Sequence, residues 1–114
     1  MEHKEERMNE KKVIEIQVNG EDLTVSPTVA HLSPNQEVVW TAGKGIRTFL
    51  LVFEQGRPFD RVELRARCDK KNEVCLLKTR VTKKDAGVFH YQVIALVDGD
   101  QLVVDTGCPT VIVQ

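Results

Sequence analysis

Short β-type segments separated by turn residues recur along the whole chain, and this pattern constrains the fold more than any other feature. Apolar and polar residues alternate over 13–18 and 62–68, as they do in strands with one buried face. Turn signals follow at intervals of roughly 8–12 residues, and no segment has a helical period. The expected strands are 13–18, 23–25, 28–32, 38–40, 48–53, 62–68, 74–81, 88–97, 102–104 and 111–113. The predicted fold class is therefore all-β, an antiparallel Greek-key β-sandwich.

Composition fits one domain with its own core. The chain has 114 residues, of which 41% are hydrophobic, and its formal net charge is −1; a chain of this size needs no metal or disulfide to fold. Residues 1–12 are mostly charged, which predicts a flexible N-terminal segment followed by one β-sandwich domain over 13–114. Neither a membrane-spanning run nor a signal peptide is visible, so we expect a cytoplasmic protein, unless its N-terminus has been processed after export.

The cysteines leave two alternatives open. Their number, three, is odd and favours free thiols in a reducing compartment. If 62–68 and 74–81 form a hairpin that turns at Lys71-Asn72, then Cys68 lies opposite Cys75, and the pairs 66/77, 64/79 and 62/81 share their apolar face. Opposed Cα atoms ~4.5 Å apart are within disulfide range, so a Cys68–Cys75 disulfide is the alternative. Cys108 is left over in either case.

Basic residues are concentrated between residues 61 and 84, which hold nine Lys and Arg against three Asp and Glu. On the predicted hairpin, Arg65 and Lys78 would share the outer face, which could meet a protein partner or an acidic ligand. A solvated hairpin whose lysines deter edge pairing is the alternative. The candidate surface consists of Arg61, Arg65, Arg67, Lys70, Lys71, Lys78 and Arg80.

Other partners follow from the same charges. Aromatic residues do not interleave with the basic run, so nucleic acid is not expected, and weak binding to it remains only an alternative. Residues 98–114 hold three Asp and no base, so the acidic and basic regions of two copies could attract each other. We also expect that edge strands could form a homo-oligomer, and no membrane contact is predicted.

Two stretches resemble the cupredoxins, the blue-copper β-sandwiches. They are V-S-P-T-V-A-H-L-S-P-N-Q-E-V-V-W at 25–40 and G-V-F-H-Y-Q-V at 87–93. The resemblance implies a cupredoxin-like sandwich, but the copper ligands are replaced: Val93 stands in the place of the Cys, and Leu96 in that of the following His. Between Trp40 and His90 there is no His, and no Met follows Met8. The expected protein therefore has no copper electron-transfer site and no cofactor.

A second resemblance is to the immunoglobulin fold, carried by D-A-G-V-F-H-Y at 85–91 and by Trp40 about fifty residues before it. Phe89 replaces the tyrosine of the immunoglobulin corner motif, and Tyr91 replaces its cysteine. Both families are β-sandwiches, so the predicted fold class is the same.

No catalytic motif is present: the chain contains neither G-x-S-x-G, H-E-x-x-H nor a phosphate-binding glycine loop. The predicted function is therefore a non-catalytic binding or interaction module, not an enzyme. The alternative is a zinc protein that uses cysteine and histidine ligands, although the Cys68-x6-Cys75 spacing differs from that of zinc knuckles. Its candidate ligands are His31, His90, Cys68, Cys75 and Cys108.

Overall fold

The computed structural model describes residues 11–54, 56–68, 75–105 and 107–114. Every regular element in these residues is a β-strand, which confirms the all-β prediction. The strands are β1 (Lys12–Asn19), β2 (Asp22–Ser26), β3 (Val29–Leu32), β4 (Glu37–Ala42), β5 (Ile46–Val52), β6 (Glu63–Arg67), β7 (Cys75–Arg80), β8 (Gly87–His90), β9 (Gln92–Val97), β10 (Gln101–Val104) and β11 (Thr110–Val113). No helix in the described part of the chain could cross a membrane.

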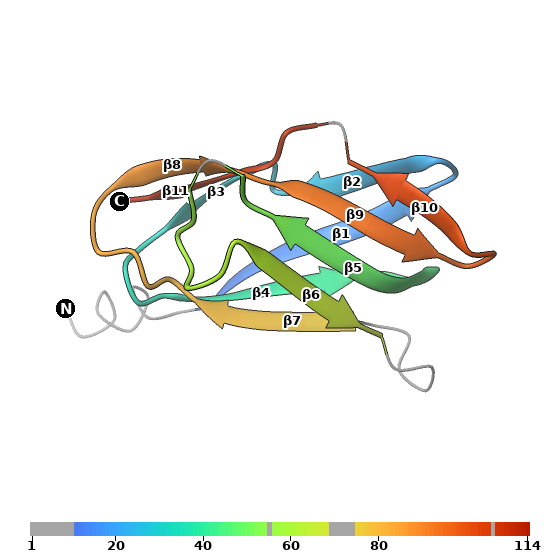
Figure 1. The fold of residues 1–114 in the computed structure, drawn as a ribbon, viewed down its shortest axis with the longest axis horizontal. Coiled ribbons are helices and arrows are strands. Elements are labelled where there is room, and N and C mark those ends of the chain that lie inside the picture. The colour runs from blue at the N-terminus through green and yellow to red at the C-terminus, as the bar shows by residue number, and fades with distance from the viewer. Residues whose placement is uncertain (1–10, 55, 69–74, 106) are drawn as a thin grey trace.

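The strands form three sheets that build a two-layer sandwich (Figure 1). A front sheet has the order β10-β9-β5-β6, and a back sheet behind it has the order β2-β1-β4-β7. An end sheet, β3-β11-β8, lies at the left of Figure 1. Most pairings are antiparallel, but β1 pairs with β4 and β3 pairs with β11 in parallel. The sheets are therefore mostly antiparallel, as expected, with two parallel pairings.

The core lies between the front and back sheets. Alternate residues of both sheets point into it, among them Ile14 and Val38 from the back and Leu51 and Val93 from the front. At its centre, the indole of Trp40 packs edge-on against aromatic neighbours, with ring centroids 5.6 and 6.0 Å away. Edge-to-face contacts of this kind are a favourable arrangement of aromatic rings. The cluster comprises Trp40, Phe53, Phe59 and Tyr91.

The predicted hairpin of 62–68 with 74–81 is wrong. β6 pairs with β5, with Leu64 opposite Leu51, whereas β7 pairs with β4, with Leu77 opposite Trp40. The two strands are therefore edges of different sheets, and the expected register 66/77, 64/79, 62/81 is absent. The prediction failed because alternation shows only which side chains face the core. Two strands with matching inward residues can lie side by side in one sheet, or they can face each other across the core from two sheets.

The expected single strand over 88–97 divides at Tyr91. β8 before it pairs with β11 of the end sheet, while β9 after it pairs with β5 of the front sheet. The Tyr91 backbone N–H donates to the Pro109 carbonyl at 3.0 Å, so this residue fixes the chain where it passes from one sheet to the other.

The N-terminal boundary also differs slightly from the prediction. β1 begins at Lys12, inside the segment expected to be flexible, because its first residues pair in parallel with β4. Residues 1–10 lie outside the described part of the chain.

Candidate binding surface

The outer face of the front sheet is apolar on three of its four strands. Phe49, Leu51 and Val93 point into the core, so their sequence neighbours on β5 and β9 point outward, because successive side chains alternate. β10 follows the same rule, with Val103 buried between two outward residues. We call the outward set the apolar face; it consists of Leu50, Val52, Ile94, Leu96, Leu102 and Val104.

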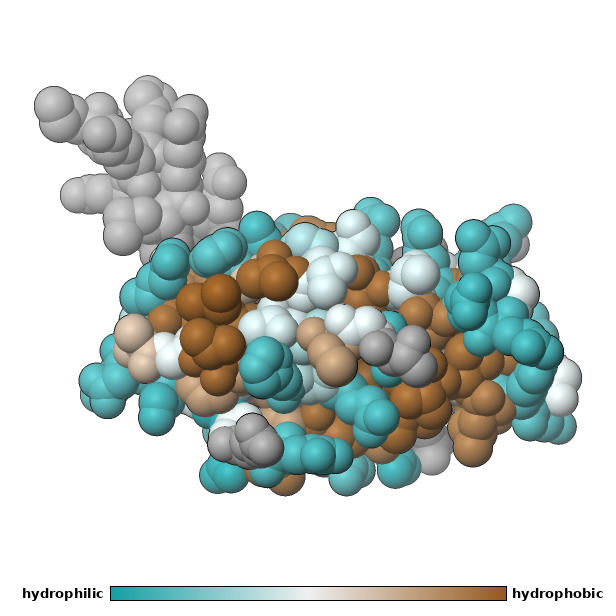
Figure 2. All heavy atoms as spheres, turned by 90° about the horizontal axis from the view of Figure 1, so that it is seen from above, coloured by the Kyte–Doolittle hydropathy of each residue, from teal (hydrophilic) through white to brown (hydrophobic). Residues whose placement is uncertain are grey.

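The strand registers bring these side chains together. Ile94 of β9 lies opposite Val104 of β10 on one side and Leu50 of β5 on the other. Leu96 lies opposite Leu102 in the next row. Leu102 is 68% exposed, and Figure 2 shows apolar side chains gathered along the lower right, the side on which the front sheet lies. The face is thus one contiguous apolar area, on which Leu102 and Val104 are exposed and the other four side chains are half-buried.

The outer face of the back sheet is different. Glu15, Thr41 and Lys78 occupy outward positions on its β1, β4 and β7 strands, which is the usual polar character of a solvated sheet face. Two large apolar side chains are exposed on this sheet, Leu76 of β7 at 53% and Val13 of β1 at 43%, and β4 lies between their strands. Of the two layers, the front sheet therefore carries the larger apolar outer face among the described residues.

Charged side chains border the apolar face in pairs. On β6, Arg65 Nη2 lies 3.8 Å from Glu63 Oε1. At the β-bulge of β5, Arg47 Nη1 lies 2.9 Å from Asp100 Oδ1 in the β9–β10 turn. These four groups therefore contribute no net charge to the border.

The seven basic residues predicted as an interaction surface do not share one face. Arg65 lies on the outer side of the front sheet, whereas Lys78 and Arg80 lie on the outer side of the back sheet. Arg80 also donates through Nη1 to the Asn35 carbonyl at 2.7 Å. The single basic face is absent because the hairpin that would carry it is not formed. Of the remaining residues, Arg61 is exposed before β6, Arg67 ends β6, and Lys70 and Lys71 lie outside the described residues.

A disulfide joins the two layers at the edge where β6 and β7 lie. Cys68 follows β6 and Cys75 begins β7, and their Cα atoms are 4.6 Å apart. Both sulfurs are therefore used in a covalent bond between the front and back sheets. Cys108 is free and exposed.

The structure does not assemble the alternative zinc site. The disulfide removes two of its candidate thiolates, and His31 and His90 lie on the outer strands of the end sheet with β11 between them. Within the described ranges, no group of three or more His, Cys, Asp or Glu side chains could hold a metal ion.

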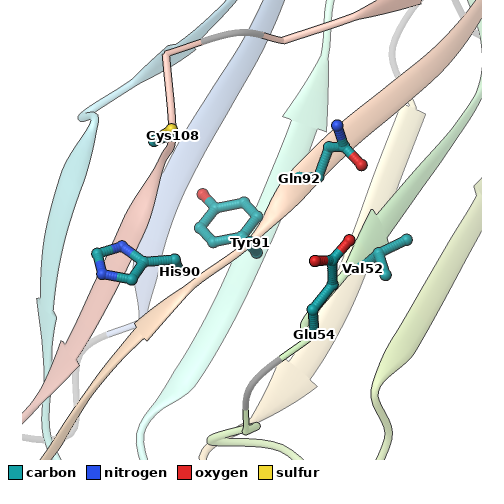
Figure 3. Close-up of a pocket in the computed structure, with 6 residues that line it drawn as sticks. All are labelled: Val52, Glu54, His90, Tyr91, Gln92 and Cys108. Carbon is teal, nitrogen blue, oxygen red and sulfur yellow. The ribbon is translucent and has the colours of Figure 1, made fainter.

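A pocket of about 280 Å³ opens next to the apolar face, where the front and end sheets meet. Figure 3 shows His90, Tyr91 and Cys108 on one side of it and the other lining residues opposite. Val52 belongs to both the pocket and the apolar face. The full lining is Val52, Glu54, His90, Tyr91, Gln92 and Cys108.

Hydrogen bonds fix the imidazole of His90 at this pocket. Thr110 donates its single hydroxyl proton to the Cys108 carbonyl at 3.1 Å, so His90 Nδ1, 2.9 Å from the same Thr110 oxygen, must be a donor. A neutral His90 therefore carries its proton on Nδ1 and presents Nε2 as an acceptor. The arrangement can accept a hydrogen bond from a ligand, but this chain of bonds ends on a backbone carbonyl and activates no nucleophile.

Tyr91 forms a buried wall of the pocket. Its hydroxyl accepts a hydrogen bond from Trp40 Nε1 at 3.3 Å. Burial raises the pKa of Tyr91 to about 12; the Trp40 hydrogen bond lowers it, and the negative charge of Asp105 raises it further. The phenol therefore stays protonated near neutral pH.

Comparison with known proteins gives a likeness to solved structures but not to known sequences. Neither a known protein family nor a curated protein matches the chain. Among solved structures, the chain is similar to auracyanin A, a blue copper protein from the green thermophilic photosynthetic bacterium Chloroflexus aurantiacus. The two are 18% identical with a TM-score of 0.49, over 92% of this chain and 100% of that chain. This neighbour is a cupredoxin, the class that the sequence resembles, but a likeness of this degree assigns neither a family nor an activity.

The apolar face is the feature that the sequence prediction missed. The signal was present in two runs, 49–53 and 93–97, in which both inward and outward positions are apolar. Such runs are typical of strands covered on both faces. Here the second face is the solvent side of the front sheet, so the runs mark an apolar outer face.

Proposed function

We propose that this protein is a non-catalytic binding module that holds a protein partner on its apolar face. The observation that supports the proposal is the contiguous set of six apolar side chains on the solvent side of the front sheet. Exposed apolar patches of a few hundred Å² on soluble proteins are often functional sites. This face replaces the basic hairpin as the proposed contact surface.

The disulfide bears on where the protein works. Disulfides persist in oxidising compartments and are rare in the cytosol, and Cys68 and Cys75 are bonded here. We therefore propose an oxidising compartment in place of the cytoplasmic location expected from the sequence.

The binding proposal is tested by comparing three immobilised forms of the chain in an extract of its own source. Wild type and Leu76→Asp, which places a charge on the back sheet, should retain the same partner. Leu102→Asp should lose it, because a carboxylate buried within an apolar contact cannot be solvated there. Both leucines are exposed, so neither variant should unfold, and circular dichroism checks this. Identical proteins on all three forms would contradict the proposal.

A further inference from the structure

The apolar face also carries information about what covers it. We infer that its partner is a second copy of this chain, packed face to face through the front sheets, an inference that rests on the proposed function. It differs from a homo-oligomer through edge strands, which would extend the sheets sideways and leave the apolar face open.

Charge is the first argument for a second copy. At the border of the face, the four groups of the ion pairs Arg65–Glu63 and Arg47–Asp100 carry no net charge. A strongly acidic or basic partner gains no electrostatic attraction there and would have to desolvate its own charges. A second copy offers the matching surface, with an apolar centre and a border of internally paired charges.

The order of the strands selects the symmetry of the pair. A two-fold axis parallel to the strands places β9 and β5 of one copy over β5 and β9 of the other, and β10 over β6. Leu102 and Val104 then meet the β6 strand of the second copy, where the apolar stem of Arg65 can cover them. An axis across the strands would instead place β6 of one copy over β6 of the other, so the charged Glu63 and Arg65 side chains of both copies would be desolvated together.

The area of the apolar face limits how tightly two copies of the chain can bind each other. Four strands ~4.8 Å apart and about five residues long, at ~3.3 Å per residue, span roughly 300 Å² in projection. Two such faces bury less than the ~1,200 Å² at the lower end of stable interfaces, so the dimer should be weak and reversible. We expect a dissociation constant in the micromolar range or higher.

Sedimentation velocity of the full chain from about 1 to 500 μM tests the inference (range chosen around the expected constant). Wild type should shift from the 12.9 kDa monomer toward twice that mass as concentration rises. Leu102→Asp should weaken the association at least ~10-fold, whereas Leu76→Asp should leave it unchanged. Added sodium chloride should not dissociate the dimer, because the contact is apolar; a pair held by charges would weaken with salt.

Three results would overturn the inference. One is a wild type that stays monomeric at the highest concentration. Another is equal weakening by Leu76→Asp and Leu102→Asp, which would place the contact elsewhere. The third is a monomer that sediments with phosphatidylcholine vesicles only when Leu102 is intact, which would assign the face to a lipid surface. A monomer that still captures a different protein through Leu102 would refute the second copy while leaving the proposed binding function standing.

Discussion

Tyr91 shows how one residue can serve both the core and the surface. Its ring belongs to the aromatic cluster with Trp40, and its backbone marks the passage of the chain from the end sheet to the front sheet. Period-two alternation along 87–93 puts Phe89, Tyr91 and Val93 on one side of an extended chain. It did not indicate the sheet change at Tyr91, since that depends on pairing with β5 and β11, which are distant in the chain.

The ionisation of Tyr91 provides a direct test of its burial. The chain contains one tyrosine, so tyrosinate absorbance reports this residue alone. The folded protein should titrate with a pKa of about 12, and the denatured protein near the ordinary value of 10.0. A folded-state midpoint close to 10 would show that the phenol is open to solvent.

The same shift makes stability depend on pH. The folded-state pKa is raised, so the contribution is complete below pH 10, where Tyr91 is protonated in both states. Above pH 10 the unfolded state loses its proton first, and the free energy of unfolding should fall by roughly 2–3 kcal/mol by about pH 12. Urea unfolding across this range measures the fall, and in Tyr91→Phe most of this tyrosine-dependent component should disappear.

At the scale of elements, the alternation of 62–68 and 74–81 predicted most of the inward side chains but not the pairing of the strands. Leu64, Ala66 and Cys75 are buried as that pattern requires, whereas Val62 is 46% exposed. The neighbour of β6 in the sheet is β5. The apolar run of β5 could pair with other strands as well, so its sequence does not select β6. Local periodicity carries no information on that choice.

Removing the disulfide should separate the contribution of the covalent link from that of the strands. The cysteines are seven residues apart, and closing a loop of about this length stabilises a fold by roughly 2–3 kcal/mol. The free energy of unfolding of the double variant Cys68→Ala/Cys75→Ala should therefore be lower by that amount, which urea unfolding measures as a lower midpoint. Dithiothreitol should reproduce the loss in wild type and in the Cys108→Ala control, but not in the double variant. Unchanged stability after verified reduction would show that the strands alone hold this edge.

The whole molecule is predictable from sequence to the level of a β-sandwich and no further. Strand positions follow from local pattern, and most lie within one or two residues of the expected ranges. The apolar face depends on three strands meeting in register, with Leu102, Ile94 and Leu50 contributed by β10, β9 and β5. A single strand shows only that its outward positions are apolar, so the continuous area becomes visible in the assembled sheet.

Association should also appear in thermal unfolding. Binding that involves only the folded state raises the melting temperature with protein concentration. Wild type should therefore melt a few degrees higher at about 200 μM than at about 5 μM, given a micromolar dissociation constant. Leu102→Asp should melt at one temperature throughout, and differential scanning calorimetry measures both. A wild-type melting temperature independent of concentration would argue against association of the folded chain.

The bond between Cys68 and Cys75 has a mechanical consequence. It joins the front and back sheets covalently along one long edge of the sandwich. Along the opposite side, β2 and β10 approach each other from different sheets, and the structure shows no covalent bond between them. The layers can therefore part at that margin, beside Leu102, while the bonded edge stays joined.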